Sequence, residues 1–241
     1  MLVKLDNPVF FVRAIEILSE LVTEVRIKVN ENGLSITAID PASVAMVGLT
    51  IPKKAFSMFK TEKEVLGVNL DDFKKILKRC NLKSSLVMEK KENALVIKIE
   101  DKIKRNFSLN LIEVESQDKE IPTHFEFSSK VEISSQDFID SIEDCAVVSD
   151  ACSFIVQDSK FIIESKDLNS AHSEFSSDEA TIQAEDCHVR YSLEYLQKFI
   201  KASKLFEKTI LNFASDHPLQ MNLSNENLNL TFILAPRVET E

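Results

Sequence analysis

Apolar side chains recur every three or four residues in four segments of the chain, and this spacing predicts amphipathic helices. In residues 8–22, Phe11, Ile15, Leu18 and Val22 fall on one face of such a helix. The other three segments with this spacing are residues 70–80, 135–146 and 192–203.

Between the predicted helices, apolar and polar residues alternate, as they do in strands that bury one face. Val25 and Val29 point to one side and Arg26 to the other. Asn32 and Gly33 are expected to supply the positive φ angles of a tight hairpin turn. The strands predicted in the first half of the chain are residues 25–29, 34–39, 44–51, 84–90, 94–100 and 104–111.

The same order of helices and strands occurs twice. Phe11–Glu16 aligns with Phe138–Glu143 at an offset of 127 residues, and Leu70–Lys78 aligns with Leu193–Lys201 at an offset of 123. A repeat of this length indicates two copies of one domain and not a solenoid. We therefore predict an α+β fold in which each copy packs two helices on antiparallel sheets.

The predicted boundaries are an N-terminal domain of residues 1–111, a connector of residues 112–126 and a C-terminal domain of residues 127–241. The connector has five acidic residues and one lysine, and it lacks a helical or strand period until its end. We expect it to run as an extended segment over the surface. An ordinary solvated loop is the alternative.

Composition narrows the possible functions. The chain has 241 residues, of which 44% are hydrophobic, so it can build a full core. Only three glycines occur, and neither a Walker sequence nor G-x-G-x-x-G is present, which disfavours the common nucleotide-binding enzymes. The net charge of −10 disfavours an ordinary nucleic-acid-binding protein, because such domains are usually basic.

Cysteines, histidines and apolar runs give little sign of a catalytic, metal or membrane function. No pair of the four cysteines has C-x-x-C spacing, so we expect free thiols in a reducing cytoplasm and no metal site. The four histidines fall in different predicted strands or loops, and no catalytic residue is assigned. We expect no signal peptide, and no apolar run approaches the roughly 18 residues of a membrane span.

Charges are sorted by helix. Residues 69–80 and residues 192–204 each carry a net charge of +2, with the basic side chains opposite the apolar face. A solvated helix face is one explanation, and segregation of charge toward an external partner is the other. The helix at 135–146 is acidic and has no basic residue of its own: its acids are Asp137, Asp140, Glu143 and Asp144.

Near the carboxyl end, the apolar run Thr231–Leu234 is followed by Ala235, Pro236 and Arg237. Proline has no N–H group to donate to a neighbouring strand, so the strand must finish at a sheet margin. The residues around Pro236 can therefore line a surface pocket.

These features together resemble the sliding clamps of the proliferating cell nuclear antigen family, in its archaeal type. The resemblance covers essentially the whole chain, and it is the joint order of its short motifs that makes it specific. The matching segments are Ala38–Val47, Gly67–Leu70, Lys75–Lys78, Ile121–Pro122, His217–Leu219 and Leu234–Arg237.

The resemblance implies a DNA-clamp fold and a ring of three subunits around duplex DNA. Such a ring acts as a processivity factor for DNA polymerase and as a docking platform for replication and repair enzymes, without catalysis, cofactor or metal. The implied partners are duplex DNA of any sequence, DNA polymerase, the clamp loader and client enzymes that bind through short peptides. We expect a homotrimer in the cytoplasm near the nucleoid of an archaeon, or in the nucleus of a eukaryote, and no membrane.

Two alternatives remain: a clamp-like scaffold that binds proteins, and one subunit of a heterotrimer that does not encircle DNA alone. An enzyme that processes nucleotides is a third class, and no visible site supports it.

The resemblance and the charge pattern nominate three sets of residues. The expected DNA contacts are Arg13, Lys74, Lys75, Lys78, Lys198, Lys201 and Lys204. The expected peptide pocket comprises Ile39, Val44, Met46, Ile121, Pro122, Pro218, Ile233, Ala235 and Pro236. At the subunit interface, Asp140 and Asp144 are expected to meet Arg79 and Arg105 of the next subunit, and edge strands near 104–111 and 170–178 are expected to pair.

Overall fold

The computed structural model of the chain describes residues 1–115, 120–122 and 125–237. Residues 116–119 and 123–124 of the predicted connector lie outside this part. The chain divides into two compact units. Unit 1 contains Met1–Pro41, Val47–Ile121 and Ser224–Leu230, and unit 2 contains Ala42–Met46, Pro122–Leu223 and the end of the chain from Thr231.

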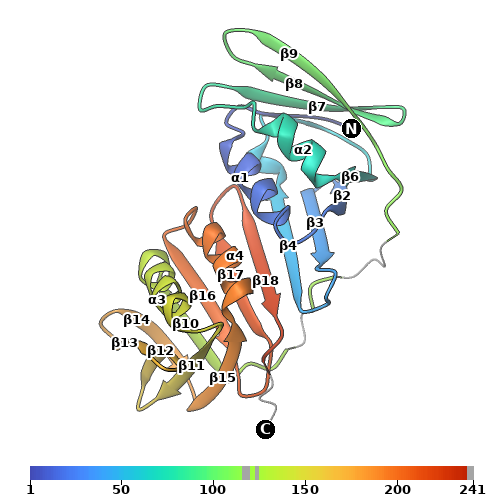
Figure 1. Ribbon diagram of the computed structural model, residues 1–241. Coiled ribbons are helices and arrows are strands. Elements are labelled where there is room, and N and C mark those ends of the chain that lie inside the picture. Colours follow the sequence, from blue (N-terminus) through green and yellow to red (C-terminus); the bar gives the residue numbers. More distant parts are fainter. Residues whose placement is uncertain (116–119, 123–124, 238–241) are drawn as a thin grey trace. The chain divides into compact units, whose positions relative to one another are not determined.

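Unit 1 combines two sets of antiparallel strands with two helices, α1 (Val9–Leu18) and α2 (Leu70–Leu77), which pack against each other (Figure 1). The first set has the order β5 (Met58–Lys60), β1 (Leu2–Leu5), β7 (Ser85–Lys91), β8 (Ala94–Glu100) and β9 (Lys104–Asn110). The second has the order β4 (Ala45–Pro52), β3 (Gly33–Ile39), β2 (Glu24–Asn30) and β6 (Glu64–Asn69), and a short 3₁₀ turn η1 (Lys53–Ala55) follows β4.

The predicted helix at 8–22 is shorter in the structure. It begins after Pro8, whose missing N–H costs nothing at a helix start, and it ends at Leu18. Leu21 and Val22 are buried although they lie beyond the helix, which explains why the apolar spacing continues past its end. The helix predicted at 70–80 likewise ends early, at Leu77, and the Asn69 side chain caps its start by accepting from the Asp72 N–H at 3.1 Å.

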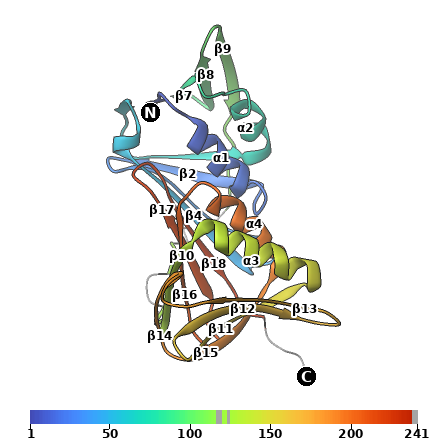
Figure 2. The same ribbon diagram turned by 90° about the vertical axis from the view of Figure 1, so that its left-hand side faces the viewer.

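Unit 2 has the same plan, with α3 (Ser135–Val148) packed against α4 (Leu193–Ser203), as Figure 1 and Figure 2 show. One set of strands has the order β14 (Ala180–Ala184), β10 (Ser129–Ser134), β16 (Lys208–Phe213), β17 (Leu219–Ser224) and β18 (Asn229–Leu234). The other has the order β13 (Ser170–Phe175), β12 (Lys160–Lys166), β11 (Ala151–Gln157) and β15 (Cys187–Ser192).

The repeat in the sequence is a repeat in the fold. Phe11 of α1 and Phe138 of α3 are both fully buried, and Leu70 and Leu193 are the first residues of α2 and α4. Each second helix starts directly after a strand, β6 or β15. The predicted α+β architecture with duplicated domains is therefore confirmed.

The first hairpin of each unit turns differently. Between β2 and β3, the expected positive φ angle occurs at Gly33 (φ 145°) but not at Asn32, so that detail of the prediction was wrong. A Cβ atom on Gly33 would lie 2.1 Å from the carbonyl oxygen of Ile51, so close backbone packing requires glycine here. In unit 2, Asp158 and Ser159 both take positive φ, at 52° and 62°.

Candidate functional site

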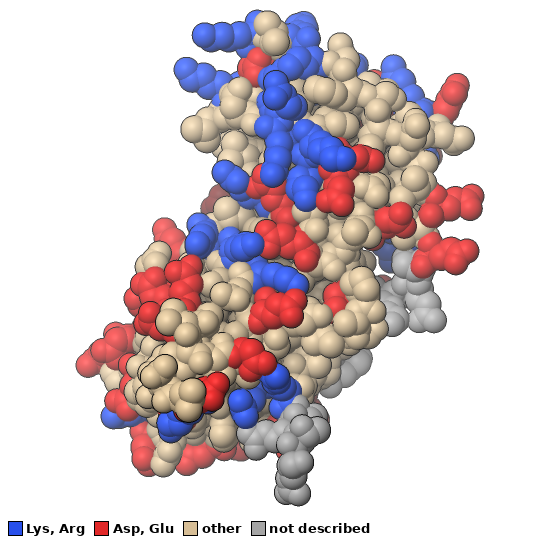
Figure 3. Space-filling view, viewed as in Figure 1, with Lys and Arg blue, Asp and Glu red and all other residues tan. Residues whose placement is uncertain are grey.

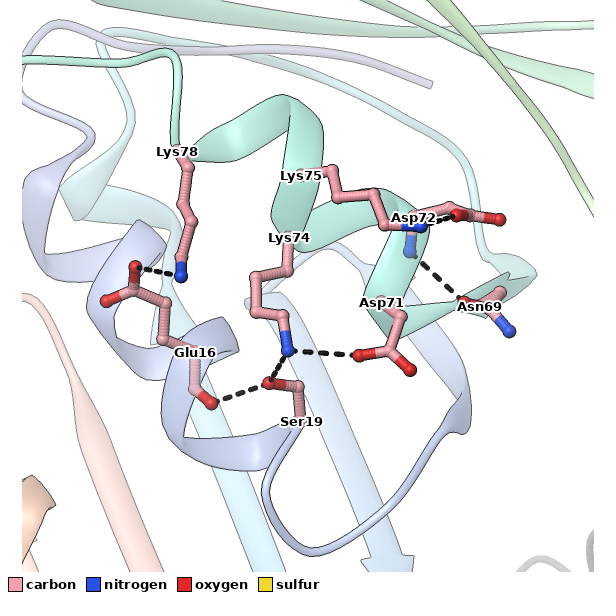
Figure 4. Close-up of polar contacts among 8 residues, drawn as sticks. All are labelled: Glu16, Ser19, Asn69, Asp71, Asp72, Lys74, Lys75 and Lys78. Carbon is pink, nitrogen blue, oxygen red and sulfur yellow. Dashed lines mark hydrogen bonds and ion pairs between the residues drawn. The ribbon is translucent and has the colours of Figure 1, made fainter.

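The basic side chains of α1 and α2 lie against carboxylates of the same unit. Glu16 of α1 accepts from the Arg13 guanidinium at 2.7 Å. Its other carboxylate oxygen lies 3.8 Å from the Lys78 ammonium, a contact that Figure 4 shows. Glu16 therefore ties a cation on its own helix to a cation that follows α2. Its side chain is 20% exposed, against 60% for Arg13 and 56% for Lys78.

The other two lysines of α2 pair within their helix. The Lys74 ammonium lies 3.0 Å from Asp71 and donates to the Ser19 hydroxyl at 2.9 Å, which links α2 to the end of α1 (Figure 4). Lys75 pairs with Asp72 at 2.8 Å, and this carboxylate raises the pKa of Lys75. Both aspartates lie in the first turn of α2, where the helix dipole also favours negative charge.

The helices of unit 2 carry fewer cations. Lys198 pairs with Glu194 at 3.0 Å and lies over the Tyr195 ring, 4.9 Å from its centroid, while Lys201 is exposed on α4. Lys204, at the end of α4, lies 3.6 Å from Glu143 of α3. The expectation that the acids of α3 lack a basic partner thus holds for the helix itself but not for unit 2, because α4 supplies a lysine.

Figure 3 shows the resulting difference in surface charge. Lys and Arg gather over α1 and α2, whereas Asp and Glu gather over α3. Both helix pairs therefore present charged faces, but with a different balance.

Only some of the predicted interface residues have side chains that can contact another subunit. Arg105 forms an ion pair with Asp101 and donates to the Arg79 carbonyl oxygen at 3.0 Å, so its guanidinium is engaged within unit 1. The Asp101 carboxyl also accepts from the Ile103 N–H, and this bond, with Arg105, lowers its pKa. The Arg79 side chain is exposed. Asp140 accepts from the Gln136 amide at 2.6 Å.

Two backbone hydrogen bonds hold the chain on either side of Pro236. The Ala235 N–H donates to the Val44 carbonyl oxygen at 2.9 Å, and the Arg237 N–H donates to the Arg190 carbonyl oxygen at 2.8 Å. Pro236 and Pro218 are half-buried and Pro122 is exposed, all three in unit 2.

Two residues of the predicted pocket are too deeply buried to offer much surface to a peptide. Met46 and Ile233 are only 8% and 7% exposed, so they contribute mainly to the core beneath it. Ile39 and Ile121 belong to unit 1, and their part in the pocket stays a prediction.

Sequence reasoning missed two features of these surfaces. The Arg237 guanidinium donates two hydrogen bonds to Asp150, one to its carboxylate at 2.8 Å and one to its carbonyl oxygen at 3.3 Å. The bond to the carboxylate lowers the pKa of Asp150. The sequence also did not identify Glu16 as a partner of two cations. The i,i+3 spacing of Arg13 and Glu16 was a local signal for one of these contacts, and the contact with Lys78 had none.

The next features to consider are possible metal ligands, membrane-spanning helices and the cysteines. Within the described parts of the chain, no three His, Cys, Asp or Glu side chains form a group that could hold a metal ion, and no helix is long and apolar enough to cross a membrane. The four cysteines are free thiols, and burial raises the pKa of both Cys80 and Cys145 to about 11.

Comparison with known proteins identifies the family. Residues 1–120 match the family described as proliferating cell nuclear antigen, N-terminal domain. The chain is 35% identical over 242 residues to DNA polymerase sliding clamp 1 of Thermococcus kodakarensis, with 97% of each chain covered. The chain belongs to the proliferating cell nuclear antigen family of DNA polymerase sliding clamps. The DNA polymerase sliding clamp of Pyrococcus furiosus is 32% identical to it, with 95% of each chain covered.

Solved structures of proliferating cell nuclear antigens have the same fold. A structure of the PCNA2–PCNA3 complex from Sulfolobus tokodaii matches with a TM-score of 0.90 and 26% identity, covering 99% of this chain and 100% of that one. The Entamoeba histolytica protein matches with a TM-score of 0.91 at 23% identity, covering 98% of each chain, and supports the fold alone. The clamp fold expected from the sequence is thereby confirmed.

Proposed function

We propose that this chain is one subunit of a ring that encircles duplex DNA and tethers DNA polymerase to it. The observation that carries the proposal is the pair of helix faces bearing lysines in a duplicated clamp fold, within a chain whose overall charge is −10. Relatives named as DNA polymerase sliding clamps support it, because they match this chain over 97% of its length.

The DNA contacts would be the seven predicted cations on α1, α2 and α4 and at the ends of α2 and α4. Lysine and arginine attract phosphates without reading bases, which suits a protein that slides. Most of these cations lie beside a carboxylate, as Lys75 lies beside Asp72. All of them are exposed to solvent except Lys74 and Lys198, which are half-buried. DNA phosphates would then compete with the protein's own acids, giving an attraction that is weak and strongly salt-dependent.

Ring closure would use the two open sheet edges. β9 is an edge strand in unit 1 and β13 is an edge strand in unit 2. If the two paired between subunits, the backbone N–H and C=O groups along both edges would gain hydrogen-bond partners. Large apolar side chains are exposed near both edges: Ile103 precedes β9, and Leu168 precedes β13. Asp140 and Asp144 would face Arg79 of the next subunit, with Arg105 holding the Arg79 backbone in place.

Client enzymes would dock at the surface around Pro236. The hydrogen bonds of Ala235 and Arg237 fix this segment, so a peptide would meet a preformed surface. A peptide with one aliphatic and two aromatic anchors would suit it, and basic flanking residues would suit the acidic connector. We propose DNA polymerase, the clamp loader and other replication or repair enzymes as the clients, and no catalysis by the clamp itself.

The decisive experiment measures retention on DNA. The variant carrying Lys75→Ala, Lys78→Ala, Lys198→Ala and Lys201→Ala should slide off circular duplex DNA sooner than the wild type and stimulate polymerase less. Both proteins should elute near three times the 27.3 kDa subunit mass. A wild type that elutes as a trimer but is retained equally with and without the four lysines would contradict the proposal for DNA.

The assembly and the peptide site need separate tests. Asp140→Lys with Asp144→Lys should shift the protein toward monomers at micromolar concentration, and an unchanged trimer would exclude this interface. Pro236→Ser should weaken binding of a Gln-x-x-aliphatic-x-x-aromatic-aromatic peptide in calorimetry. Binding unaffected by that change would place the client site elsewhere, whereas a wild type that trimerises only with a different clamp chain would indicate a heterotrimer.

A further inference from the structure

Glu16 is placed where it neutralises two of the proposed DNA contacts. One carboxylate oxygen lies 2.7 Å from the Arg13 guanidinium. The other lies 3.8 Å from the Lys78 ammonium, as Figure 4 shows. Guanidinium and ammonium groups bind a carboxylate and a phosphate in the same way, through charge-assisted hydrogen bonds. Glu16 therefore occupies the position that a DNA phosphate would take between these two cations.

The three side chains share a solvent-open hollow. A cavity of about 380 Å³ is lined by Arg13, Glu16 and Lys78 together with Val9, Val12 and Leu82. This space is large enough to admit a phosphate group beside the carboxylate. Arg13 and Lys78 are each more than half exposed, so they can turn from Glu16 to an incoming phosphate.

The arrangement recurs in the second unit. Glu143 aligns with Glu16 in the sequence repeat, and it lies 3.6 Å from Lys204, at the end of α4. A carboxylate on the first helix of each unit thus faces a lysine at the end of the second helix. The contact in unit 2 is weaker, because it involves one cation and Glu143 is more exposed than Glu16.

We propose that Glu16, with Glu143 as its weaker counterpart, competes with DNA phosphate for the clamp's own cations and so limits how tightly the ring holds DNA. This inference rests on the proposed function of encircling DNA. A phosphate that binds Arg13, Lys78 or Lys204 must then displace an internal carboxylate. The DNA is consequently held loosely enough to slide, although lysines and arginines lie along the helices.

The test compares two glutamates that each lie beside two cations. Glu16→Gln removes the negative charge that lies beside Arg13 and Lys78. Glu89→Gln makes the same change on β7, where Glu89 lies 3.5 Å from Lys91 and 3.4 Å from Lys98. Glu89 follows the buried Met88 and so points to the outer face of its sheet, away from the helices. Glu16→Asp keeps the charge and serves as the conservative variant.

Binding of each trimer to a labelled 60-base-pair duplex is followed by fluorescence anisotropy over a KCl series, with thermal unfolding measured in parallel. Glu16→Gln should bind roughly 3- to 10-fold more tightly at low salt, and the slope of log K against log salt should steepen by about 0.9 for each cation that gains a phosphate. Glu143→Gln should give a smaller change in the same direction. Glu89→Gln and Glu16→Asp should stay close to the wild type.

The outcomes separate this inference from the function on which it rests. If the wild type binds with a clear salt slope and Glu16→Gln has the same affinity and slope, Glu16 only joins α1 to α2 and the inference is wrong. An equal gain for Glu89→Gln would also overturn it, because net charge alone would then explain the effect. If neither the wild type nor Glu16→Gln binds duplex DNA at any salt concentration, the proposal of a DNA-encircling ring fails first.

Discussion

The helix pair of unit 1 and the helix pair of unit 2 share their buried faces but not their exposed ones. Phe11 and Phe138 are fully buried at the same place in the repeat. On the outside, α1, α2 and their ends (residues 9–22 and 70–80) carry five basic and four acidic side chains, whereas residues 135–148 and 193–204 carry three basic and five acidic. The two helix pairs therefore resemble each other more in the residues that pack in the core than in the charges on their surfaces.

Even the shared core is not built identically. Phe11 packs edge-on against Phe73 of α2, with ring centroids 5.9 Å apart. Phe138 instead meets Phe154 of β11 at 6.2 Å, and Phe154 also contacts Phe161, Tyr191 and Phe213. Unit 2 thus has a larger aromatic cluster behind its first helix.

Removal of the buried phenylalanine should give the largest effect. Phe11→Ala and Phe138→Ala should each reduce the free energy of unfolding by about 3–5 kcal/mol, with the larger loss at Phe138 because it opens a cavity beside an aromatic cluster. Denaturant unfolding followed by far-UV circular dichroism measures both. Phe10→Ala, at a half-buried position of α1, is the control. A larger loss at Phe11 would show that the helix–helix contact outweighs the cluster.

The two hairpin turns should respond in opposite directions. Gly33→Ala should cost about 1–3 kcal/mol, because its Cβ would clash with the Ile51 carbonyl at a backbone angle that L-residues rarely adopt. Ser159→Gly should stabilise by roughly 0.5–1 kcal/mol, because glycine removes the strain of a positive φ. Thermal unfolding checks both, and a stabilising Gly33→Ala would mean that the Ile51 backbone gives way.

The difference in charge should appear as unequal dependence on the two helix pairs. Alanine at Lys74, Lys75 and Lys78 should weaken binding of duplex DNA roughly tenfold at moderate salt, or about 1.4 kcal/mol. Alanine at Lys198, Lys201 and Lys204 should weaken it less, because these lysines act beside the acidic α3. The salt series used for Glu16 gives both values, and equal losses would mean that the acids of α3 do not reach the DNA.

Acid should have the smallest effect on stability, and one carboxylate in each unit allows the two units to be compared. The pKa of Asp101 is lowered by the Ile103 N–H and Arg105, and that of Asp150 by Arg237. Because both are lowered by folding, their contribution to stability is present above the ordinary carboxyl pKa of about 4 and is lost as the pH falls below it.

Asp101→Asn should therefore flatten the acid side of the stability curve more than Asp150→Asn does, since Asp101 is far less exposed than Asp150. Melting temperatures measured from pH 6 to pH 3 provide the test. A greater effect of Asp150→Asn would show that Arg237 contributes more to the fold than its exposure suggests.

The sequence by itself determined the four helices, many of the strands and their duplication, but it did not predict β1, β5 or β6. Those features depend on local periods of apolar residues, which a chain shows directly: Ile15 and Leu18 mark one helix face as clearly as Val25 and Val29 mark a strand. It also showed that α2 and α4 are basic, because side chains three and four residues apart on a helix share a face. Helix ends were less certain, since Leu21 and Val22 extend the apolar spacing beyond α1.

Only the tertiary structure decided which charges meet between helices. The partners of Lys78 and Lys204 lie on neighbouring helices, 62 and 61 residues away in the sequence, and no local period predicts such a contact. Arg105, which was expected at the subunit interface, is held within its own unit by Asp101, four residues away, and by the Arg79 carbonyl, 26 residues away. Hydrophobic spacing is a property of one segment, and so are ion pairs three or four residues apart, such as Lys75 with Asp72. Ion pairs between helices depend on how two segments pack, so the basic faces could be predicted from the sequence, whereas the contacts of Lys78 and Lys204 with the neighbouring helix could not.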